Sequence, residues 1–269
     1  MPFLREVARA RPPLPLVIPL FLALASGCDG EPAQEPEPWV SRPVSQWPAM
    51  VLNNEIHFAD TVFHDLGNAF LIDLGRDTVG VTVKHILSFL AETKELDSIH
   101  LGPDFLRWKM VSPKQEGAEV RVLELINENS SERIGEFNTL KVRDWLVFRV
   151  DASESGVVPL HVRSTLLRKG QKAYAVGRSL EGRQDPEPTV TPLRIFQNVG
   201  PYYYVESLDS QADPAGTSGS PVIDENGHLV GMVAGASGNL GVVAGLGYLK
   251  EVVQRYGLPS SASRGTGAP

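Results

Sequence analysis

The sequence predicts an all-β fold that contains two six-stranded antiparallel β-barrels and a C-terminal helix. Short apolar runs recur along the chain, about six on each side of residue 155, and turn residues separate most of them. The 269 residues also include 25 Gly and 21 Pro, a composition that favours strands joined by turns over long helices. Periodicity alone is equally compatible with one large β-sandwich.

The expected strands are apolar runs that are mostly bounded by Gly, Pro, Asn or Asp. In the first half they are residues 56–58, 69–74, 79–83, 120–126, 145–150 and 157–160. In the second half they are residues 173–177, 190–197, 202–207, 221–224, 229–236 and 242–247. Two segments, 85–96 and 249–256, carry apolar residues at helical spacing and are predicted to be helices.

The N-terminal residues are typical of a secretory signal. Arg5, Arg9 and Arg11 precede an apolar stretch, residues 14–25, and small residues follow it. The stretch is too short to span a bilayer, which needs about 20 apolar residues. We therefore expect residues 1–27 to be a signal peptide and the mature protein to be exported.

Cys28 is the single cysteine of the chain and follows Leu-Ala-Ser-Gly. Residues 24–28 resemble a bacterial lipobox, in which the signal is cut before a diacylated cysteine. The resemblance implies a palmitate-bearing lipoprotein held to a membrane through Cys28, in the cell envelope, on its periplasmic or extracellular face. The alternative is an ordinary signal peptide in which Cys28 has no special role.

The remaining chain divides by composition. Residues 28–48 are rich in Pro and Glu and are predicted to be a flexible tether. Residues 49–258 form the expected folded domain, with an N-terminal barrel at about 49–155 and a C-terminal barrel at about 156–258. Residues 259–269 are small and polar and are predicted to be a disordered tail.

Charge and residue spacing exclude two classes of function. The net charge is −7 and the pI about 5.4, so no basic surface is expected to bind nucleic acid. No group of His, Cys and Asp has the spacing of metal ligands. We expect neither a metal nor another cofactor.

Residues 215–224, AGTSGSPVID, are the strongest local signal for chemistry. Gly216 and Gly219 bracket Ser218, and glycines let a backbone bring its N–H groups close to a bound carbonyl. Such donors are what an oxyanion hole needs. The alternative is an ordinary Gly/Ser turn between two strands.

A serine nucleophile needs a base, and the base needs an acid that orients it. Among the six histidines, His85 has the best setting, because it ends the strand 79–83 where a helix begins. Asp144 stands directly before the apolar strand 145–150. Asp151, at the other end of that strand, is the competing acid, with a turn residue as its simpler interpretation.

Together these motifs resemble the trypsin-like, chymotrypsin-fold serine protease superfamily. Residues 216–221 match G-x-S-G-[GS]-P, the strand before His85 resembles T-A-x-H with Val83 in place of a small residue, and Asp144 opens a strand as the family's aspartate does. The order His, Asp, Ser is that of the chymotrypsin fold. The resemblance covers about residues 50–257, and it is expected to be to the form of the family without a PDZ domain.

The resemblance implies a serine endopeptidase that acts on proteins or peptides through an acyl-enzyme. Ser218 is the implied nucleophile, His85 the base and Asp144 the orienting acid, with the backbone N–H groups of Gly216 and Ser218 as oxyanion donors. The alternative is a catalytically inactive lipoprotein that uses the protease fold for binding or scaffolding.

Substrate selection is expected to depend on small, uncharged residues near the nucleophile. By position in the motif, Ala212 lies at the base of the S1 pocket, and Ala234, Gly235 and Ala236 form the substrate-binding strand. This lining predicts a modest apolar P1 residue. Asp213, if it faced inward, would favour Lys or Arg instead.

Overall fold

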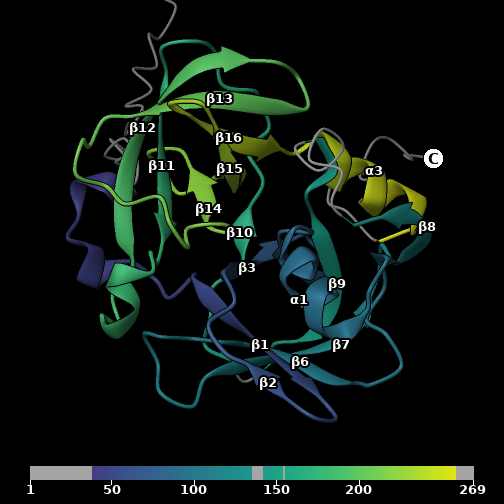
Figure 1. Cartoon of the computed structure of the whole chain (residues 1–269). Coiled ribbons are helices and arrows are strands. Elements are labelled where there is room, and N and C mark those ends of the chain that lie inside the picture. Colours follow the sequence, from purple (N-terminus) through teal and green to yellow (C-terminus); the bar gives the residue numbers. More distant parts are fainter. Residues whose placement is uncertain (1–37, 135–141, 154, 259–269) are drawn as a thin grey trace, which may run out of the picture. The chain divides into compact units, whose positions relative to one another are not determined.

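The computed structural model describes residues 38–134, 142–153 and 155–258, which form two β-barrels and helices α1 and α3 (Figure 1). The predicted fold class is confirmed: both barrels are closed, antiparallel and six-stranded, and a helix follows the second. The predicted signal peptide, Cys28, the tether up to residue 37 and the tail from residue 259 lie outside the described residues.

The first barrel closes because β1 pairs with β6 along its length and with β3 at its start. Leu52 lies opposite Ala69 and Asn53 opposite Asn68, so the ring runs β3-β4-β9-β7-β6-β1 and returns to β3. Its strands are β1 (Leu52–Phe58), β3 (Asn68–Asp73), β4 (Thr78–Thr82), β6 (Phe105–Val111), β7 (Glu119–Leu125) and β9 (Leu146–Asp151). Short strands outside the ring are β2 (Val62–Phe63), β5 (Ser98–Ile99), β8 (Asn129–Arg133) and β10 (Leu160–His161).

The second barrel is a ring in the order β11-β12-β13-β16-β15-β14. Its strands are β11 (Lys172–Gly177), β12 (Thr189–Asn198), β13 (Tyr202–Ser207), β14 (Pro221–Ile223), β15 (Leu229–Ser237) and β16 (Leu240–Gly245). The helices are α1 (Ile86–Lys94), between β4 and β5, and α3 (Gly247–Arg255), after β16. A short 3₁₀ helix, Glu181–Gln184, connects β11 to β12.

Strand β6 shows how alternation builds the first core. Trp108 and Met110 point inward and are buried, whereas the neighbouring Arg107 is exposed and Lys109 is half-buried. The Trp108 ring packs 4.8 Å from that of Phe148, and its Nε1 donates to Asn54 Oδ1 at 2.9 Å. The sequence analysis missed this strand because Arg107 and Lys109 interrupt its apolar run.

Two buried contacts join the barrels near the base of α3. Trp145 Nε1 donates to the carbonyl of Gly245 at 3.2 Å. The fully buried Lys84 ammonium pairs with Glu132 Oε1 at 2.7 Å and donates to the Tyr248 hydroxyl at 3.2 Å. A buried charge is costly without partners, so these contacts hold the end of β4 against α3.

The ordered domain begins before residue 49, and the predicted tether is therefore too long. Residues 38–48 contain two short 3₁₀ helices, Trp39–Ser41 and Val44–Gln46. Trp47 is buried, and its Nε1 donates to the carbonyl of Arg42 at 3.1 Å. The Pro and Glu content suggested a spacer, but two tryptophans that pack edge to face give this segment enough apolar surface to bury.

Candidate active site

His85 stands where β4 ends and α1 begins. It is the residue before the helix, and its backbone is already near helical, with φ −63° and ψ −10°. Strand β9 lies beside β4, with Leu146 opposite Thr82, so the residue that precedes β9 reaches the residue that follows β4. That register brings Asp144 to His85.

Asp144 holds His85 through both carboxylate oxygens. Its Oδ2 accepts from His85 Nδ1 at 2.7 Å and its Oδ1 accepts from the His85 backbone N–H at 2.9 Å. The carboxyl is 1% exposed, and this burial raises the pKa of Asp144 above its ordinary value, while the hydrogen bonds from His85 act in the opposite direction. Among the described residues, Nε2 is the nitrogen of the imidazole ring that makes no hydrogen bond.

Asp151, the competing acid, lies at the far end of β9. Its carboxylate pairs with Arg121 Nη2 at 2.5 Å, which lowers the pKa of Asp151. The structure therefore brings Asp144, and not Asp151, to His85.

The loop that carries Ser218 connects β13 to β14. Gly216 and Gly219 have φ values of +80° and +84°, a region that favours glycine. The carbonyl of Ala215 accepts from the Leu180 N–H at 2.8 Å. Because the peptide unit is planar and trans, this bond turns the Gly216 N–H in the opposite direction.

The backbone N–H groups of Gly216 and Ser218 are free in the structure. Among the described residues, neither group has a hydrogen-bond acceptor in range. Two unpaired N–H groups, one on the serine itself and one two residues before it, are the arrangement that stabilises a negatively charged oxygen. Both of the predicted oxyanion donors are therefore available.

The Ser218 loop rests on the strands that lead to His85. The carbonyl of Ser218 accepts from the Asn68 N–H at 2.8 Å. A Cβ on Gly219 would lie only 2.0 Å from the Asn68 carbonyl oxygen and 3.0 Å from Thr82 Oγ1, so the two backbones are in direct contact. Within the described residues the Ser218 hydroxyl makes no hydrogen bond to His85. Such bonds are often long in ligand-free enzymes and shorten in the substrate complex.

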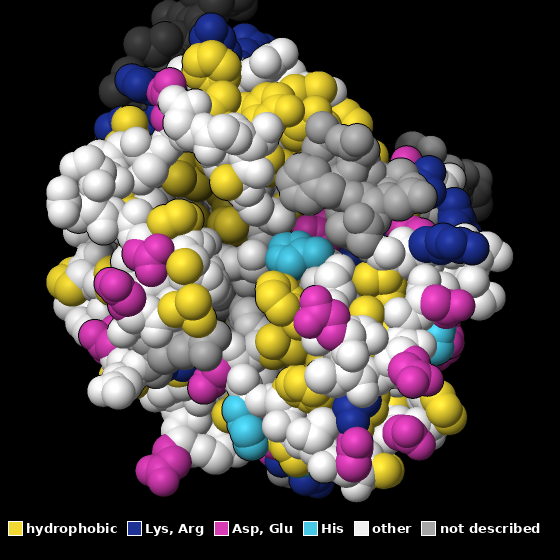
Figure 2. Space-filling view, viewed as in Figure 1, with side chains coloured by type: hydrophobic (Ala, Val, Ile, Leu, Met, Phe, Trp, Pro, Cys, Tyr) yellow, Lys and Arg dark blue, Asp and Glu magenta, His cyan; other side chains and the backbone are white. Residues whose placement is uncertain are grey.

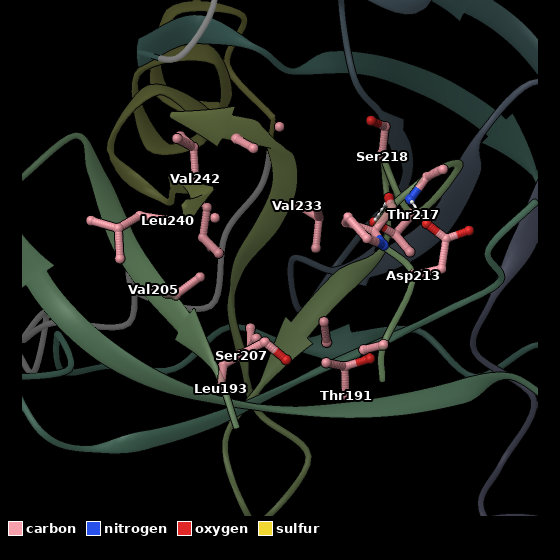
Figure 3. A pocket seen from close by; sticks show the side chains of 18 of the residues that line it. Thr191, Leu193, Val205, Ser207, Asp213, Thr217, Ser218, Val233, Leu240 and Val242 are labelled. Carbon is pink, nitrogen blue, oxygen red and sulfur yellow. Dashed lines mark hydrogen bonds between the residues drawn. The ribbon is translucent and has the colours of Figure 1, made fainter. Parts of the chain in front are cut away.

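A cavity of about 520 Å³ opens beside Ser218 in the second barrel. The space-filling view shows a hollow lined by hydrophobic side chains in this region (Figure 2). Leu193, Val205, Leu240 and Val242 lie on its inner side, opposite Asp213 and Thr217 (Figure 3). The cavity is larger and more apolar than the sequence analysis expected, because strands β12, β13 and β16 contribute side chains that carry no local motif.

Three of the four predicted substrate-binding residues line this cavity, namely Ala212, Gly235 and Ala236. Ala234 does not: it is 5% exposed and packs into the core. Asp213 lines the cavity, but its Oδ1 accepts from the Ala215 N–H at 2.9 Å. One oxygen of its carboxylate thus accepts from the turn that precedes the Ser218 loop.

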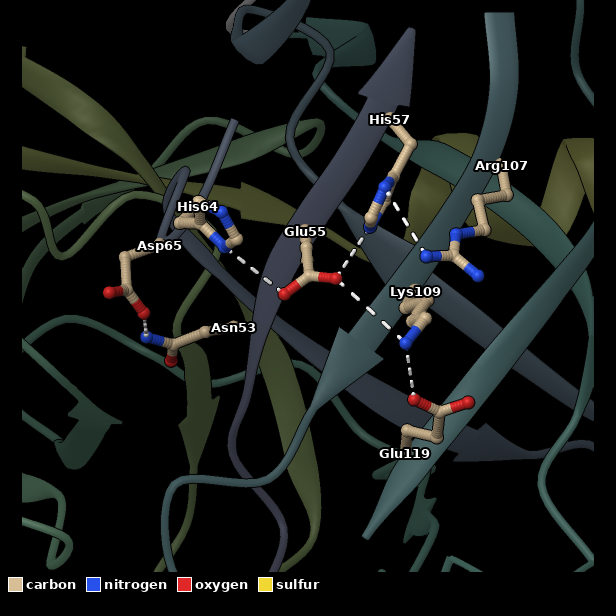
Figure 4. A network of polar contacts seen from close by, with 8 residues as sticks. All are labelled: Asn53, Glu55, His57, His64, Asp65, Arg107, Lys109 and Glu119. Carbon is tan, nitrogen blue, oxygen red and sulfur yellow. Dashed lines mark hydrogen bonds and ion pairs between the residues drawn. The ribbon is translucent and has the colours of Figure 1, made fainter. Parts of the chain in front are cut away.

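Two other histidines, His57 on β1 and His64 directly after β2, belong to a polar network that Glu55 centres (Figure 4). Glu55 contacts His57 Nε2 at 2.6 Å and His64 Nδ1 at 3.1 Å, and these contacts, with Lys109, lower the pKa of Glu55. Glu55 thus occupies one ring nitrogen of each histidine. In the part of the chain that the structure describes, no group of His, Cys, Asp or Glu is arranged to hold a metal ion.

Comparison with known proteins identifies the family. The family described as "Trypsin-like peptidase domain" matches residues 70–232, which is more than half of the chain and includes His85, Asp144 and Ser218. The chain belongs to the trypsin-like peptidase family. Its fold is that of the trypsin-like serine proteases. A search among curated proteins found no significant match.

Two solved structures show how far the fold of this peptidase-family chain is shared. The active form of the Rv3671c protease of M. tuberculosis has a TM-score of 0.53 and 19% identity, over 85% of this chain and 89% of that one. The serine endoprotease of Yersinia pestis has a TM-score of 0.51 and 16% identity, over 79% of this chain and 65% of that one. At these identities the likeness establishes the fold alone.

Proposed function

We propose that the chain is a serine endopeptidase with Ser218 as nucleophile, His85 as general base and Asp144 as the orienting acid. The observation that carries the proposal is the Asp144–His85 pair at 2.7 Å, on the strands against which the Ser218 loop rests. A binding module of this family would have no need of a buried carboxylate that fixes one histidine tautomer.

The reaction is acyl transfer to water. Ser218 Oγ attacks the scissile carbonyl carbon while its proton passes to His85 Nε2, and the N–H groups of Gly216 and Ser218 hold the oxyanion. His85 then gives this proton to the departing amine as the C–N bond breaks. In the second half, His85 takes a proton from water, the hydroxide attacks the acyl-enzyme, and the proton returns to Ser218.

The cavity supports a preference for a large apolar P1 side chain. Its volume of about 520 Å³ exceeds what an alanine or valine would fill, and its inner wall is aliphatic. Among the lining residues that the structure describes, only Asp213 on the opposite side carries a charge that would favour Lys or Arg, and one of its oxygens accepts from the Ala215 N–H of its own turn. We expect peptides with Phe or Leu at P1 to give a kcat/KM at least about 10-fold above those with Ala or Lys.

The proposed enzyme is exported and anchored to a membrane by a diacylated Cys28, on the periplasmic or extracellular face of the cell envelope. The sequence of residues 1–28 supports this part of the proposal. No helix among the described residues is long and apolar enough to cross a bilayer. Metabolic labelling with palmitate tests the anchor: label is expected in the wild type and absent in Cys28→Ser.

A fluorophosphonate probe tests the chemistry. Residues 38–269 are incubated with the probe beside the Ser218→Ala and His85→Ala variants, and Ser164→Ala, an exposed serine, is the matched control. Labelling is expected in the wild type and the control and absent in the other two. A well-folded wild type that remains unlabelled and cleaves no peptide would contradict the proposal and favour a binding protein.

A further inference from the structure

Asn68 links the first barrel to the Ser218 loop of the second. It is the first residue of β3, and its side chain is 1% exposed. Its Nδ2 donates to the carbonyls of Gly216 at 2.9 Å and Arg178 at 3.1 Å, and its Oδ1 accepts from the Arg178 N–H at 2.9 Å. One buried carboxamide thus pairs with the main chain at two places in the other barrel.

Both of these places lie next to the peptide unit that carries the free Gly216 N–H. The bond to Gly216 fixes the carbonyl of this same residue, in the next peptide unit along the chain. The bonds to Arg178 fix the segment that continues to Leu180, whose N–H binds the carbonyl of Ala215 and so orients the same Gly216 N–H from its other side.

The backbone of Asn68 holds the residue that carries the second donor, through the peptide unit that follows it. Its N–H binds the carbonyl of Ser218 at 2.8 Å, and its own carbonyl accepts from Thr82 Oγ1 at 2.6 Å. The loop is therefore bound to Asn68 at residues 216 and 218, the two residues that carry the free N–H groups.

We propose that the Asn68 carboxamide is a positioning residue that orients the oxyanion hole. The inference rests on the proposed peptidase function. It means that a side chain of the first barrel sets the geometry of two N–H donors in the second barrel. Only an amide has the required pattern, since it offers N–H donors to two carbonyls and an acceptor to one N–H. A carboxylate of the same shape would face the Gly216 and Arg178 carbonyls with lone pairs.

The test is kinetic and uses Asn68→Asp, which keeps the shape and removes the donors. Asn198→Asp is the matched control, because Asn198 also donates to a carbonyl and accepts an N–H in the second barrel, at Leu167 and Gly200, away from the Ser218 loop. Peptide hydrolysis and the rate of fluorophosphonate labelling are measured for each purified variant, together with its melting temperature.

Asn68→Asp is expected to lower kcat and the labelling rate by about 10²-fold, the loss seen when an oxyanion donor is removed, with KM within about 3-fold of the wild type. Asn198→Asp is expected to keep both rates. The low-field proton resonance of His85 Nδ1, which reports the bond to Asp144, is expected to be unchanged in both variants.

If Asn68→Asp does not fold, Asn68→Ser decides, since its shorter hydroxyl donor leaves space and reaches at most one carbonyl. An active wild type with Asn68 variants of unchanged kcat would overturn this inference alone. An equal fall in kcat in Asn68→Asp and in the control Asn198→Asp would also overturn it. A wild type without labelling or hydrolysis would overturn the proposed function, and this inference with it.

Discussion

Substitution of Gly219 by alanine is the sharpest test of how the Ser218 loop is held. The new Cβ would lie 2.0 Å from the carbonyl oxygen of Asn68 and 2.8 Å from its carbon, both backbone atoms. An ordinary contact needs at least 3.4 Å, so one of the two backbones has to move by about 1.4 Å. In addition, φ at this residue is +84°, which strains any residue with a Cβ.

The cost divides into two parts. Strain at positive φ contributes roughly 1–2 kcal/mol, and overpacking adds roughly 1–3 kcal/mol, so the free energy of unfolding falls by about 2–5 kcal/mol. For a domain of this size each kcal/mol lowers Tm by about 2–4 °C. A displacement of about 1 Å at a nucleophile also lowers kcat by about 10²-fold.

Gly170→Ala separates the two parts. Gly170 lies in the second barrel with φ +86°, and no heavy atom lies within 4 Å of the Cβ position. The free energy of unfolding of Gly170→Ala is expected to fall only by the cost of positive-φ strain, about 1–2 kcal/mol. This variant is expected to keep the wild-type activity. The assays are thermal unfolding and peptide hydrolysis. Equal Tm and kcat for the two variants would refute the contact between Gly219 and Asn68.

Three further outcomes are expected. Asp144→Asn lowers kcat about 10⁴-fold in a steady-state assay. Because the pKa of Asp144 is raised in the folded state, the native wild type binds more protons than the unfolded chain, and its stability falls as pH rises from the ordinary carboxyl value of 3.8 to the folded pKa. The Tm of Asp144→Asn is expected to lack this fall with pH. Glu132→Gln leaves the Lys84 ammonium buried without its charge partner and costs about 3–5 kcal/mol in urea unfolding, of which Lys84→Met in the same chain restores a large part. Trp145→Phe removes the hydrogen bond to Gly245 and costs about 1–3 kcal/mol by the same measurement, with kcat as the control for Asp144 placement.

The strands that could be predicted are those that appear in the sequence as an uninterrupted apolar run between turn residues. Strand β13 was predicted with its observed bounds, Tyr202–Ser207, because an apolar run and clear turns define it. Strand β6 was missed, since the exposed Arg107 and the half-buried Lys109 on either side of Trp108 interrupt its apolar run. The predicted strand 157–160 was mostly wrong: only Leu160 lies in β10.

The residues of the candidate site also divide into those that local motifs predict and those that they do not. His85, Asp144 and Ser218 were predicted from short motifs next to strands that the sequence displays, and the structure brings Asp144 to His85. The aliphatic wall of the cavity was missed, since Leu193, Val205 and the residues of β16 are ordinary core residues until the barrel closes. Asn68 could not be found, because its partners lie 110 and 148 residues further along the chain.

The hydrogen bonds between Asn68 and the Ser218 loop bear on the stage of folding at which activity can begin. During synthesis, His85 and Asp144 enter a barrel that is complete before the nucleophile has been made. Asn68 of β3 binds the carbonyls of Gly216 and Ser218, so the two N–H donors belong to a loop that the first barrel holds. We therefore expect peptide hydrolysis to require that both barrels have folded and docked.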